Sequence, residues 1–226
     1  MIEELLPAAV VTVEAYGDED AEGTVLYPEE AAVVARAVDK RRREFAAVRG
    51  CARRAMEKLG VPPQPLVPGD RGAPRWPDGL TGSMTHCDGY RAAALVRAGD
   101  LASLGIDAEP DEPLPDGVLA AVALPGEALR VGRLTRERPG IRWDRLLFSA
   151  KESVYKAWFP LTGRWLDFTE ADIELLAEPG GPPHGRLTAT LLVPGPLVGG
   201  RRVAAFEGRW TVGHGFLATA VAVPHG

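Results

Sequence analysis

The sequence has little cysteine and no long run of apolar residues. Cys51 and Cys87 are its two cysteines among 226 residues, too few for a disulfide framework. Its longest apolar stretches fall well short of the roughly 20 residues that a transmembrane helix needs. The acidic first segment, Met1–Pro7, also lacks the pattern of a signal peptide. We therefore expect a cytoplasmic protein with reduced thiols and no membrane-spanning segment.

Positive charge is also scarce. The chain has 26 lysines and arginines against 31 aspartates and glutamates, which gives a net charge of −5. Nucleic-acid-binding domains need a basic surface, so a nucleic-acid partner is not expected. Nothing in the sequence requires an oligomer, and we expect a monomer.

The pattern of apolar residues predicts both helices and strands. Helices are expected from Pro28 onward, over Asp39–Leu59 and over Trp143–Trp158, where Pro160 ends the last of them. Strands are expected at Val10–Ala15, Tyr90–Val96, Leu101–Glu109, Ile173–Leu176, Arg186–Leu192, Arg202–Phe206, Arg209–Val212 and Phe216–Val223. This mixture predicts an α+β fold with two parts of similar size, residues 1–105 and 106–226.

Two carboxylates share one face of a predicted strand. Side chains alternate along Leu104–Glu109, so Asp107 and Glu109 lie together on one face, and Pro110 ends the strand. Neighbouring acids repel each other unless a proton or a cation lies between them. Mg²⁺ takes one or two carboxylates together with phosphate oxygens, so the motif favours phosphate chemistry.

The second predicted helix carries arginines along its apolar stripe. Arg41 is in line with the stripe, and Arg49 and Arg53 border it. The helix could fray at Arg41 and leave that side chain in water. Alternatively, the arginines converge on an anionic ligand, since guanidinium groups suit phosphate.

The helix predicted at Trp143–Trp158 contains the charged motif Lys151-Glu152, followed by Lys156. Glu152 and Lys156 alone could be an exposed pair one turn apart. That reading does not explain Lys151, which falls inside the apolar arc. His86 alone would more often be a structural or surface histidine, and the His86-Cys87 pair has no second pair at zinc-ligand spacing.

Together these motifs resemble a known family. Gly105–Glu109 resembles the G-[IV]-D-x-E signature of the Sfp-type 4′-phosphopantetheinyl transferases, and Phe148–Lys156 resembles their W-x-x-K-E-[SA]-x-x-K signature. Ser83–His86 is similar to the family's [ST]-H segment. The likeness spans about residues 30–170 and is strongest to the actinobacterial members that activate polyketide and nonribosomal peptide synthetases.

The resemblance implies a function and a fold. The family transfers the phosphopantetheine arm of coenzyme A to a serine of an apo acyl or peptidyl carrier protein and releases 3′,5′-ADP. Its fold is two pseudo-symmetric α/β halves with the active site in the cleft between them. Residues 1–105 would then bind the nucleotide end of coenzyme A, and residues 106–226 would carry the metal site and the surface for the carrier protein.

The resemblance also implies roles for individual residues. Asp107, Glu109 and Glu152 would hold Mg²⁺ or Mn²⁺ against the pyrophosphate of coenzyme A. Glu152 would also deprotonate the incoming serine, and Lys156 would stabilise charge on the pyrophosphate.

Further residues would bind coenzyme A. By resemblance, Arg41, Arg49 and Arg71 would bind its 3′-phosphate and adenine end, and Thr85 and His86 its phosphates. Lys151, held by its apolar neighbours, would point its ammonium at phosphate.

The sequence departs from the family pattern in two places. Phe148 replaces the signature tryptophan, and Pro68 stands where close relatives often have a basic residue. Ala108, the middle residue of the metal motif, has no ligand atom, so water and phosphate oxygens would complete the shell of Mg²⁺.

Two other functions use the same residues. A Mg²⁺-dependent phosphohydrolase would explain the acids but not the arginines of the second helix. A non-catalytic module that binds coenzyme A or a carrier protein would not need the carboxylates. The segment Phe159–Trp165, with Arg164, could dock the carrier protein, or it could simply close the core.

Overall fold

The computed structural model describes residues 1–17, 23–180 and 182–226. Its first part contains η1 (Glu3–Leu5), β1 (Val11–Tyr16), α1 (Pro28–Val33), α2 (Asp39–Lys58), η3 (Asp70–Gly72), β2 (Leu80–Cys87) and β3 (Tyr90–Arg97). Then follow β4 (Ser103–Pro110), α3 (Val118–Val122), α4 (Pro125–Glu137), α5 (Trp143–Thr162) and η4 (Phe168–Glu170). The chain finishes with β5 (Ala171–Ala177), β6 (His184–Leu191), β7 (Leu197–Val198), β8 (Arg201–Arg202), β9 (Ala205–Gly213) and β10 (Phe216–Val223).

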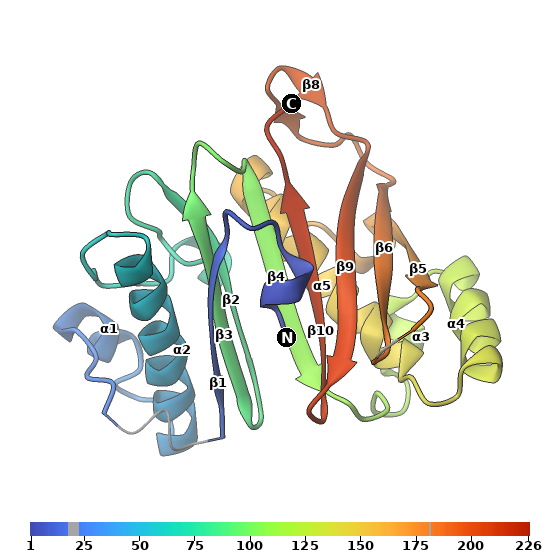
Figure 1. The fold of residues 1–226 in the computed structure, drawn as a ribbon, viewed down its shortest axis with the longest axis horizontal. Coiled ribbons are helices and arrows are strands. Elements are labelled where there is room, and N and C mark those ends of the chain that lie inside the picture. Colours follow the sequence, from blue (N-terminus) through green and yellow to red (C-terminus); the bar gives the residue numbers. More distant parts are fainter. Residues whose placement is uncertain (18–22, 181) are drawn as a thin grey trace.

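The strands form two main sheets that lie next to each other (Figure 1). The first has the order β1-β3-β2, and the second has the order β4-β10-β9-β6-β5. All of these neighbours pair antiparallel. β7 and β8 form a small separate hairpin. The combination of helices and antiparallel sheets confirms the predicted α+β class.

Strand β3 is buried on both faces because it lies between two layers. Ala93 and Leu95 pack in one core with residues of α2, including Cys51, Ala52 and Met56. The alternate residues of β3, such as Ala92 and Ala94, pack in another core with β4 and β10. The apolar stripe predicted for α2 therefore covers the outer face of the first sheet.

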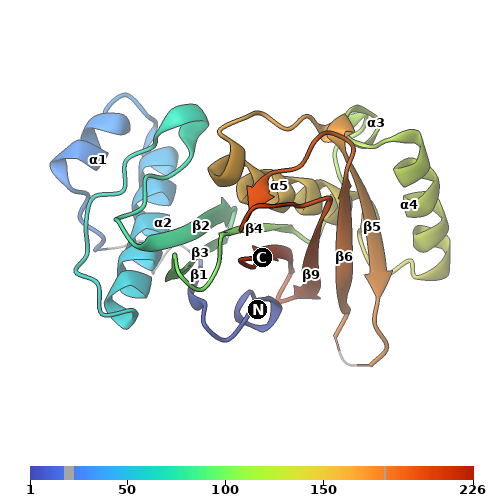
Figure 2. The same ribbon diagram turned by 90° about the horizontal axis from the view of Figure 1, so that it is seen from above.

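Helix α5 covers one face of the second sheet, and the N-terminal segment with η1 lies on the opposite face (Figure 2). Trp143 of α5 packs edge-on against Trp210 of β9, with 5.4 Å between the ring centroids. Trp143, Trp158 and Trp210 are all within 1 % of full burial. Burying a large aromatic side chain stabilises a fold by about 2–3 kcal/mol, so each of these three tryptophans contributes roughly this much to stability.

Side-chain hydroxyls join the two sheets between β2 and β4. Ser83 accepts a hydrogen bond from the backbone amide of Ile106 at 3.1 Å, and Thr85 accepts one from Ala108 at 3.2 Å. These hydroxyls act where a strand partner would supply carbonyl oxygens, so neither buried amide of β4 is left without an acceptor. The junction brings Thr85 next to the carboxylate motif of β4.

Two predicted boundaries need correction. α5 does not end before Pro160, since it continues to Thr162 and closes at Gly163, whose φ of 62° is left-handed. The two strands expected at Arg202–Phe206 and Arg209–Val212 are also wrong, because β9 is one strand over Ala205–Gly213. Proline removes its own amide donor and crowds the preceding turn, but only two helical residues follow Pro160, and Leu161 packs against the core of the second sheet.

The predicted division at residues 105 and 106 falls inside β4, which belongs to the second sheet along its whole length. That division and the pseudo-symmetry of the two parts stay predictions. None of the helices in the described ranges is both long enough and apolar enough to span a membrane.

Candidate active site

A pocket of about 480 Å³ lies between the first part of the molecule and α5. Its walls come from four places in the chain: α1 with the following turn, α2, the loop around η3 with β2, and the second half of α5. The basic and acidic side chains that line it are Arg41, Arg49, Arg71, His86, Glu152 and Lys156. Sequence segments more than a hundred residues apart therefore meet here.

One wall of the pocket is basic. The Nη1 of Arg41 lies 2.8 Å from Nε2 of His86. The buried guanidinium of Arg49 lies 3.1 Å from the centre of the Phe45 ring and donates to the carbonyl oxygens of Leu66 and Phe45. Stacking and carbonyl contacts fix the position of Arg49, so its charge is held at the wall before any ligand arrives.

The pKa values of this wall show how its charges act on one another. Burial lowers the pKa of Arg49 to about 10, Glu30 opposes this, and the nearby charges of Arg41 and Arg53 lower it further. Burial also lowers the pKa of His86, and Arg41 is the next cause. An anion between these cations would reduce their repulsion, because an opposite charge favours the charged form of each side chain. The wall therefore suits an anionic ligand.

The carboxylates stand where β4 crosses α5. A Cβ atom on Gly105 would lie only 2.0 Å from the carbonyl oxygen of Ser153, so only glycine allows the strand and the helix this close. Around this contact, Ser103 donates to the carbonyl oxygen of Ala157 at 2.8 Å. The same close packing places Asp107 of β4 against Lys156 of α5.

Asp107 is buried and holds its partners through one oxygen. Its Oδ1 accepts from Nζ of Lys156 at 2.7 Å and from the hydroxyl of Thr85 at 3.2 Å. Its Oδ2 is buried without a hydrogen-bond partner in the described structure. A buried carboxylate oxygen without a donor is costly, and a bound cation would remove that cost.

Glu109 and Glu152 are close enough to Asp107 to feel its charge. Burial raises the pKa of Glu109, Asp107 raises it further, and Arg145 opposes the change. Burial likewise raises the pKa of Glu152, with Asp107 as the next cause and Lys156 acting against it. Three neighbouring carboxylates offer the charge and the hard oxygen atoms that a divalent cation such as Mg²⁺ binds.

The acids are not arranged as a complete metal cage. Over residues 1–17, 23–180 and 182–226, no three His, Cys, Asp or Glu side chains are gathered closely enough to hold a metal ion by themselves. Mg²⁺ usually keeps several waters and binds through one or two carboxylates plus substrate phosphates. A metal ion bound here would therefore need oxygen ligands beyond these side chains.

Comparison with known proteins identifies the family. A family model described as the 4′-phosphopantetheinyl transferase N-terminal domain matches residues 29–96, and one for the 4′-phosphopantetheinyl transferase superfamily matches residues 103–193. The 4′-phosphopantetheinyl transferase Svp of Streptomyces mobaraensis is 60 % identical over 99 % of this chain and 89 % of its own. The chain belongs to the 4′-phosphopantetheinyl transferase superfamily.

Other relatives agree. The 4′-phosphopantetheinyl transferase PptT of Mycobacterium tuberculosis is 46 % identical over 98 % of this chain and 97 % of its own. Npt of Nocardia iowensis, with the same description, is 48 % identical over 98 % and 99 %. These matches confirm that the protein is an enzyme of this family, with coenzyme A as co-substrate and carrier proteins as the kind of partner.

The transferase brings most of the predicted site residues together. Arg41, Arg49, Arg71, His86, Glu152 and Lys156 line the pocket. Asp107 contacts Lys156 at its edge. Arg71 adopts a left-handed backbone conformation with a φ of 52°, and its guanidinium lies 5.6 Å from the centre of the Trp165 ring. Their individual roles stay predictions.

Lys151 is not where the sequence interpretation placed it. The structure does not show its ammonium pointing into the pocket, because Nζ contacts Glu127 at 2.9 Å and the carbonyl oxygens of Phe168 and Ala171 at 2.6 and 3.0 Å. Glu127 is 1 % exposed, so this is a buried ion pair. The partner of Lys151 lies 24 positions earlier in the sequence, on α4.

Thr85 also differs from its predicted role. It is buried, and its hydroxyl is occupied by Asp107 and the amide of Ala108 rather than lining the pocket. Two further charged residues were missed. Glu30, fully buried, pairs with Arg53 and accepts from the amide of Leu66, and Arg145 pairs with Glu109. A carboxylate in the first turn of a helix and an arginine near an acidic motif are weak signals, because both are common on surfaces.

Proposed function

We propose that this transferase moves the 4′-phosphopantetheine group of coenzyme A to a serine hydroxyl of an apo carrier protein, that it needs Mg²⁺ and that it releases 3′,5′-ADP. The observation that carries the proposal is that one pocket joins a basic wall to Glu152 and Lys156, with Asp107 at its edge. Coenzyme A has the matching shape, with a 3′-phosphate at one end and a pyrophosphate in the middle.

The basic wall would bind the nucleotide end. Arg41 and His86 lie on one side of the pocket, and the fixed guanidinium of Arg49 lies on α2 beside them. Arg71 enters from the loop around η3. Guanidinium groups bind phosphate oxygens through paired N–H donors, so these residues would hold the 3′-phosphate and orient the pyrophosphate toward α5.

The acidic side of the site would perform the transfer. In the proposed reaction the serine oxygen bonds to the phosphorus next to pantetheine, and the bond from that phosphorus to the bridging oxygen breaks. The electron pair leaves with 3′,5′-ADP, Glu152 takes the serine proton, and Lys156 stabilises charge on the phosphates. Such transfers depend mainly on positioning and on neutralising charge.

Asp107, Glu109 and Glu152 are the residues that would hold Mg²⁺. When bound, the ion would neutralise charge on the pyrophosphate oxygens and orient the leaving group. Mn²⁺ offers the same kind of oxygen coordination, and the choice between the two metals stays a prediction. So do the monomeric state, the cytoplasmic location and the lack of a nucleic-acid partner.

Intact mass spectrometry of an apo acyl carrier protein tests the proposal. Incubation with the protein, coenzyme A and Mg²⁺ is expected to add one phosphopantetheine, and EDTA or the variant Glu152→Gln is expected to abolish the gain. Glu174→Gln, on the exposed side of β5, is the matched control and should leave the gain intact. Release of 3′,5′-ADP at a comparable rate without any carrier protein would favour the phosphohydrolase instead. A protein that binds coenzyme A but modifies neither acyl nor peptidyl carrier proteins would favour a binding module.

A further inference from the structure

The two acids of β4 have different cationic partners. Asp107 pairs with Lys156 at 2.7 Å, and both belong to the sequence motifs of the family. Glu109 pairs with Arg145 of α5 at 2.9 Å. Arg145 precedes Lys151 by six residues and lies outside those motifs, so a second cation enters the acidic site from the first half of the helix.

The guanidinium of Arg145 is held at three points. Its Nη1 donates to Oε2 of Glu109 at 2.9 Å. Its Nε donates to the carbonyl oxygen of Glu112 at 3.1 Å, and its Nη2 donates to that of Pro113 at 2.8 Å. Because the guanidinium is planar, three acceptors in different directions fix its orientation as well as its place. Arg145 thereby ties α5 to the end of β4 and to the segment that follows it.

This contact works against a repulsion within the site. Asp107 and Glu152 both carry charge of the same sign as Glu109, and only the carboxylate of Asp107 is paired with Lys156. Like charges at short range in a partly buried site favour rotation of one group toward water. Glu109 is the second-last residue of β4, yet its side chain is only 20 % exposed. The contact with Arg145 explains why it stays.

The inference rests on the metal set of the proposed function. We propose that Arg145 is a positioning residue that anchors Glu109 through Oε2, so that Oε1 is available to the divalent cation. Arg145 itself touches neither the metal nor coenzyme A. Partners that orient metal ligands in this way change metal affinity by about 10- to 100-fold when they are removed.

The sign of the effect separates positioning from simple charge. If Arg145 acted only as a nearby positive charge, its removal would strengthen the binding of a dication, because a repulsion would be lost. If it positions Glu109, its removal weakens metal binding. The two accounts therefore predict opposite changes in one measurement.

The test is to measure Mn²⁺ binding to the complex of the full-length protein with coenzyme A by electron paramagnetic resonance. We expect Arg145→Met to weaken the binding by about tenfold or more. Arg145→Lys keeps the charge but cannot reach Glu109 and both carbonyl oxygens together, so it should bind Mn²⁺ more weakly than wild type and more tightly than Arg145→Met. The Mg²⁺ concentration for half-maximal activity should rise in the same order, with a smaller change in the rate at saturating Mg²⁺.

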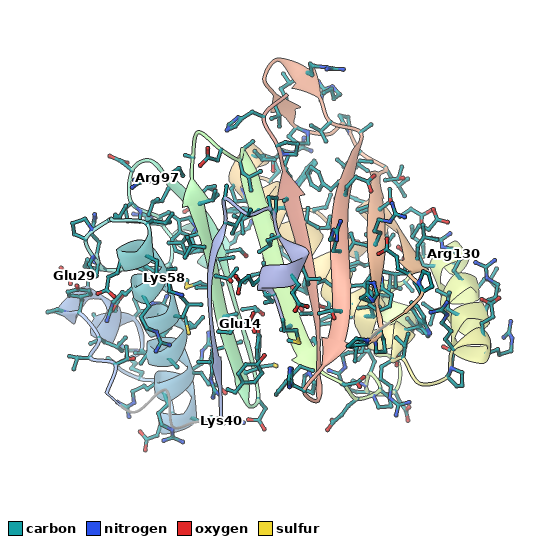
Figure 3. All side chains as sticks on the ribbon, viewed as in Figure 1. Glu14, Glu29, Lys40, Lys58, Arg97 and Arg130 are labelled. Carbon is teal, nitrogen blue, oxygen red and sulfur yellow. The ribbon has the colours of Figure 1, made fainter. Side chains whose placement is uncertain are left out.

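A matched control is available at the opposite edge of the second sheet, where β5 lies. Arg130 of α4 also pairs with a carboxylate, that of Asp172, and donates to the carbonyl oxygen of Ile173 at 3.0 Å. Figure 3 shows Arg130 at the α4 end of the molecule, opposite Lys40 near α2. Arg130→Met removes the same kind of pair without touching the site, and Mn²⁺ binding should stay at the wild-type level.

Each outcome decides between clear alternatives. Mn²⁺ affinity at or above the wild-type level in Arg145→Met would overturn the proposal. Should Arg145→Met fail to fold, a folded Arg145→Lys with wild-type affinity would overturn it equally, because the lysine lacks the three-point anchor. Wild-type protein that binds no Mn²⁺ with coenzyme A would instead refute the proposed metal site itself, whereas equal binding by wild type and both variants refutes only the role of Arg145.

Discussion

Two lysines on α5, five residues apart, have opposite surroundings. Lys151 is buried against Glu127, which also accepts from the amides of Leu124 and Ile173. Lys156 contacts Asp107 and lines the pocket. Lys151 is paired away from the pocket and Lys156 is part of the pocket wall, so only Lys156 should affect the binding of coenzyme A and its transfer directly.

Lys151→Met should therefore destabilise the protein, by about 3–5 kcal/mol, because Glu127 would be left buried and unpaired. Its folded fraction should bind coenzyme A nearly as wild type does. Lys156→Met should instead cause a large loss of transfer activity. Because it leaves the buried carboxylate of Asp107 without its cation, it should also lower stability. Urea denaturation and calorimetric titration with coenzyme A measure both quantities. A Lys151→Met protein of normal stability but with weak coenzyme A binding would restore the role predicted from the sequence.

His86 gives the stability of the protein a specific dependence on pH. Burial and then Arg41 lower the pKa of His86 in the folded state. Glu44 opposes this change, and Lys156 and Arg91 lower the pKa slightly further. Below a pH of about 6.5, the ordinary histidine value, the unfolded chain takes up a proton that the folded protein does not. The free energy of unfolding should therefore decrease as the pH is lowered from about 6.5 to the pKa of His86 in the folded state.

The difference between wild type and His86→Gln isolates this effect. Urea denaturation from pH 7.5 to pH 5 should show wild type losing more stability than the variant over that window. The other histidines contribute equally to both proteins and cancel. Parallel pH profiles would show that His86 titrates in the folded protein much as it does in the unfolded chain.

At this scale the sequence predicts residues whose position follows from a local period. Asp107 and Glu109 share a strand face, and Glu152 and Lys156 are one helical turn apart. Both relations depend only on backbone geometry. The partners of Lys151 and Glu109 could not be predicted in this way, because Glu127 and Arg145 reach them across tertiary contacts that have no sequence period.

Among the elements, the crossing of β4 and α5 decides the geometry of the site. The two elements approach each other closely at Gly105, where a Cβ atom would lie 2.0 Å from a backbone atom of Ser153 and 2.7 Å from one of Ala157. Buried hydroxyls of Ser153 and Thr219 continue the contact toward β10. The family motif gives glycine at this position, but the need for it becomes evident only from the helix packed on top.

Gly105→Ala should push α5 away from β4 and separate Asp107 from Lys156. We expect a loss of about 3 kcal/mol, at the upper end of overpacking effects, together with a loss of transfer activity in the fraction that still folds. Thermal unfolding and the carrier-protein mass assay measure these losses.

Gly132→Ala on α4 is the control. A Cβ atom there would meet only the end of the Arg136 side chain at 3.7 Å. Replacing a helical glycine by alanine where the added methyl group meets no clash usually stabilises by up to about 1 kcal/mol. If Gly105→Ala behaved like this control, the close approach of strand and helix would not be needed for the site.

Element type was easier to predict than element ends. α2 and α5 carry apolar stripes over 20 residues each, and such long periods leave little doubt about helix. Pro160 misled the prediction of the end of α5, since proline is a local signal and the apolar contacts of the last turn are not. β9 was split in two because Gly208, in its middle, has the local preference of a turn.

Across the whole molecule, β3 and the β2–β4 junction make the two parts depend on each other. β3 contributes one face to the core under α2 and the other face to the core with β4 and β10. Neither part could keep β3 buried alone, and the amides of Ile106 and Ala108 need Ser83 and Thr85 from the other part. We therefore expect both parts to unfold in one cooperative step.

Amide hydrogen exchange monitored by mass spectrometry tests this coupling. The slowest amides of α2 and of α5 should report the same free energy of opening, because both require global unfolding. Thr85→Val leaves the buried amide of Ala108 without its acceptor, and this should lower the opening free energy of both helices by an equal amount, about 1–3 kcal/mol. Faster exchange in α2 alone would mean that the first part opens independently. The pocket would then lose its basic wall while the carboxylates of β4 and α5 stayed in place.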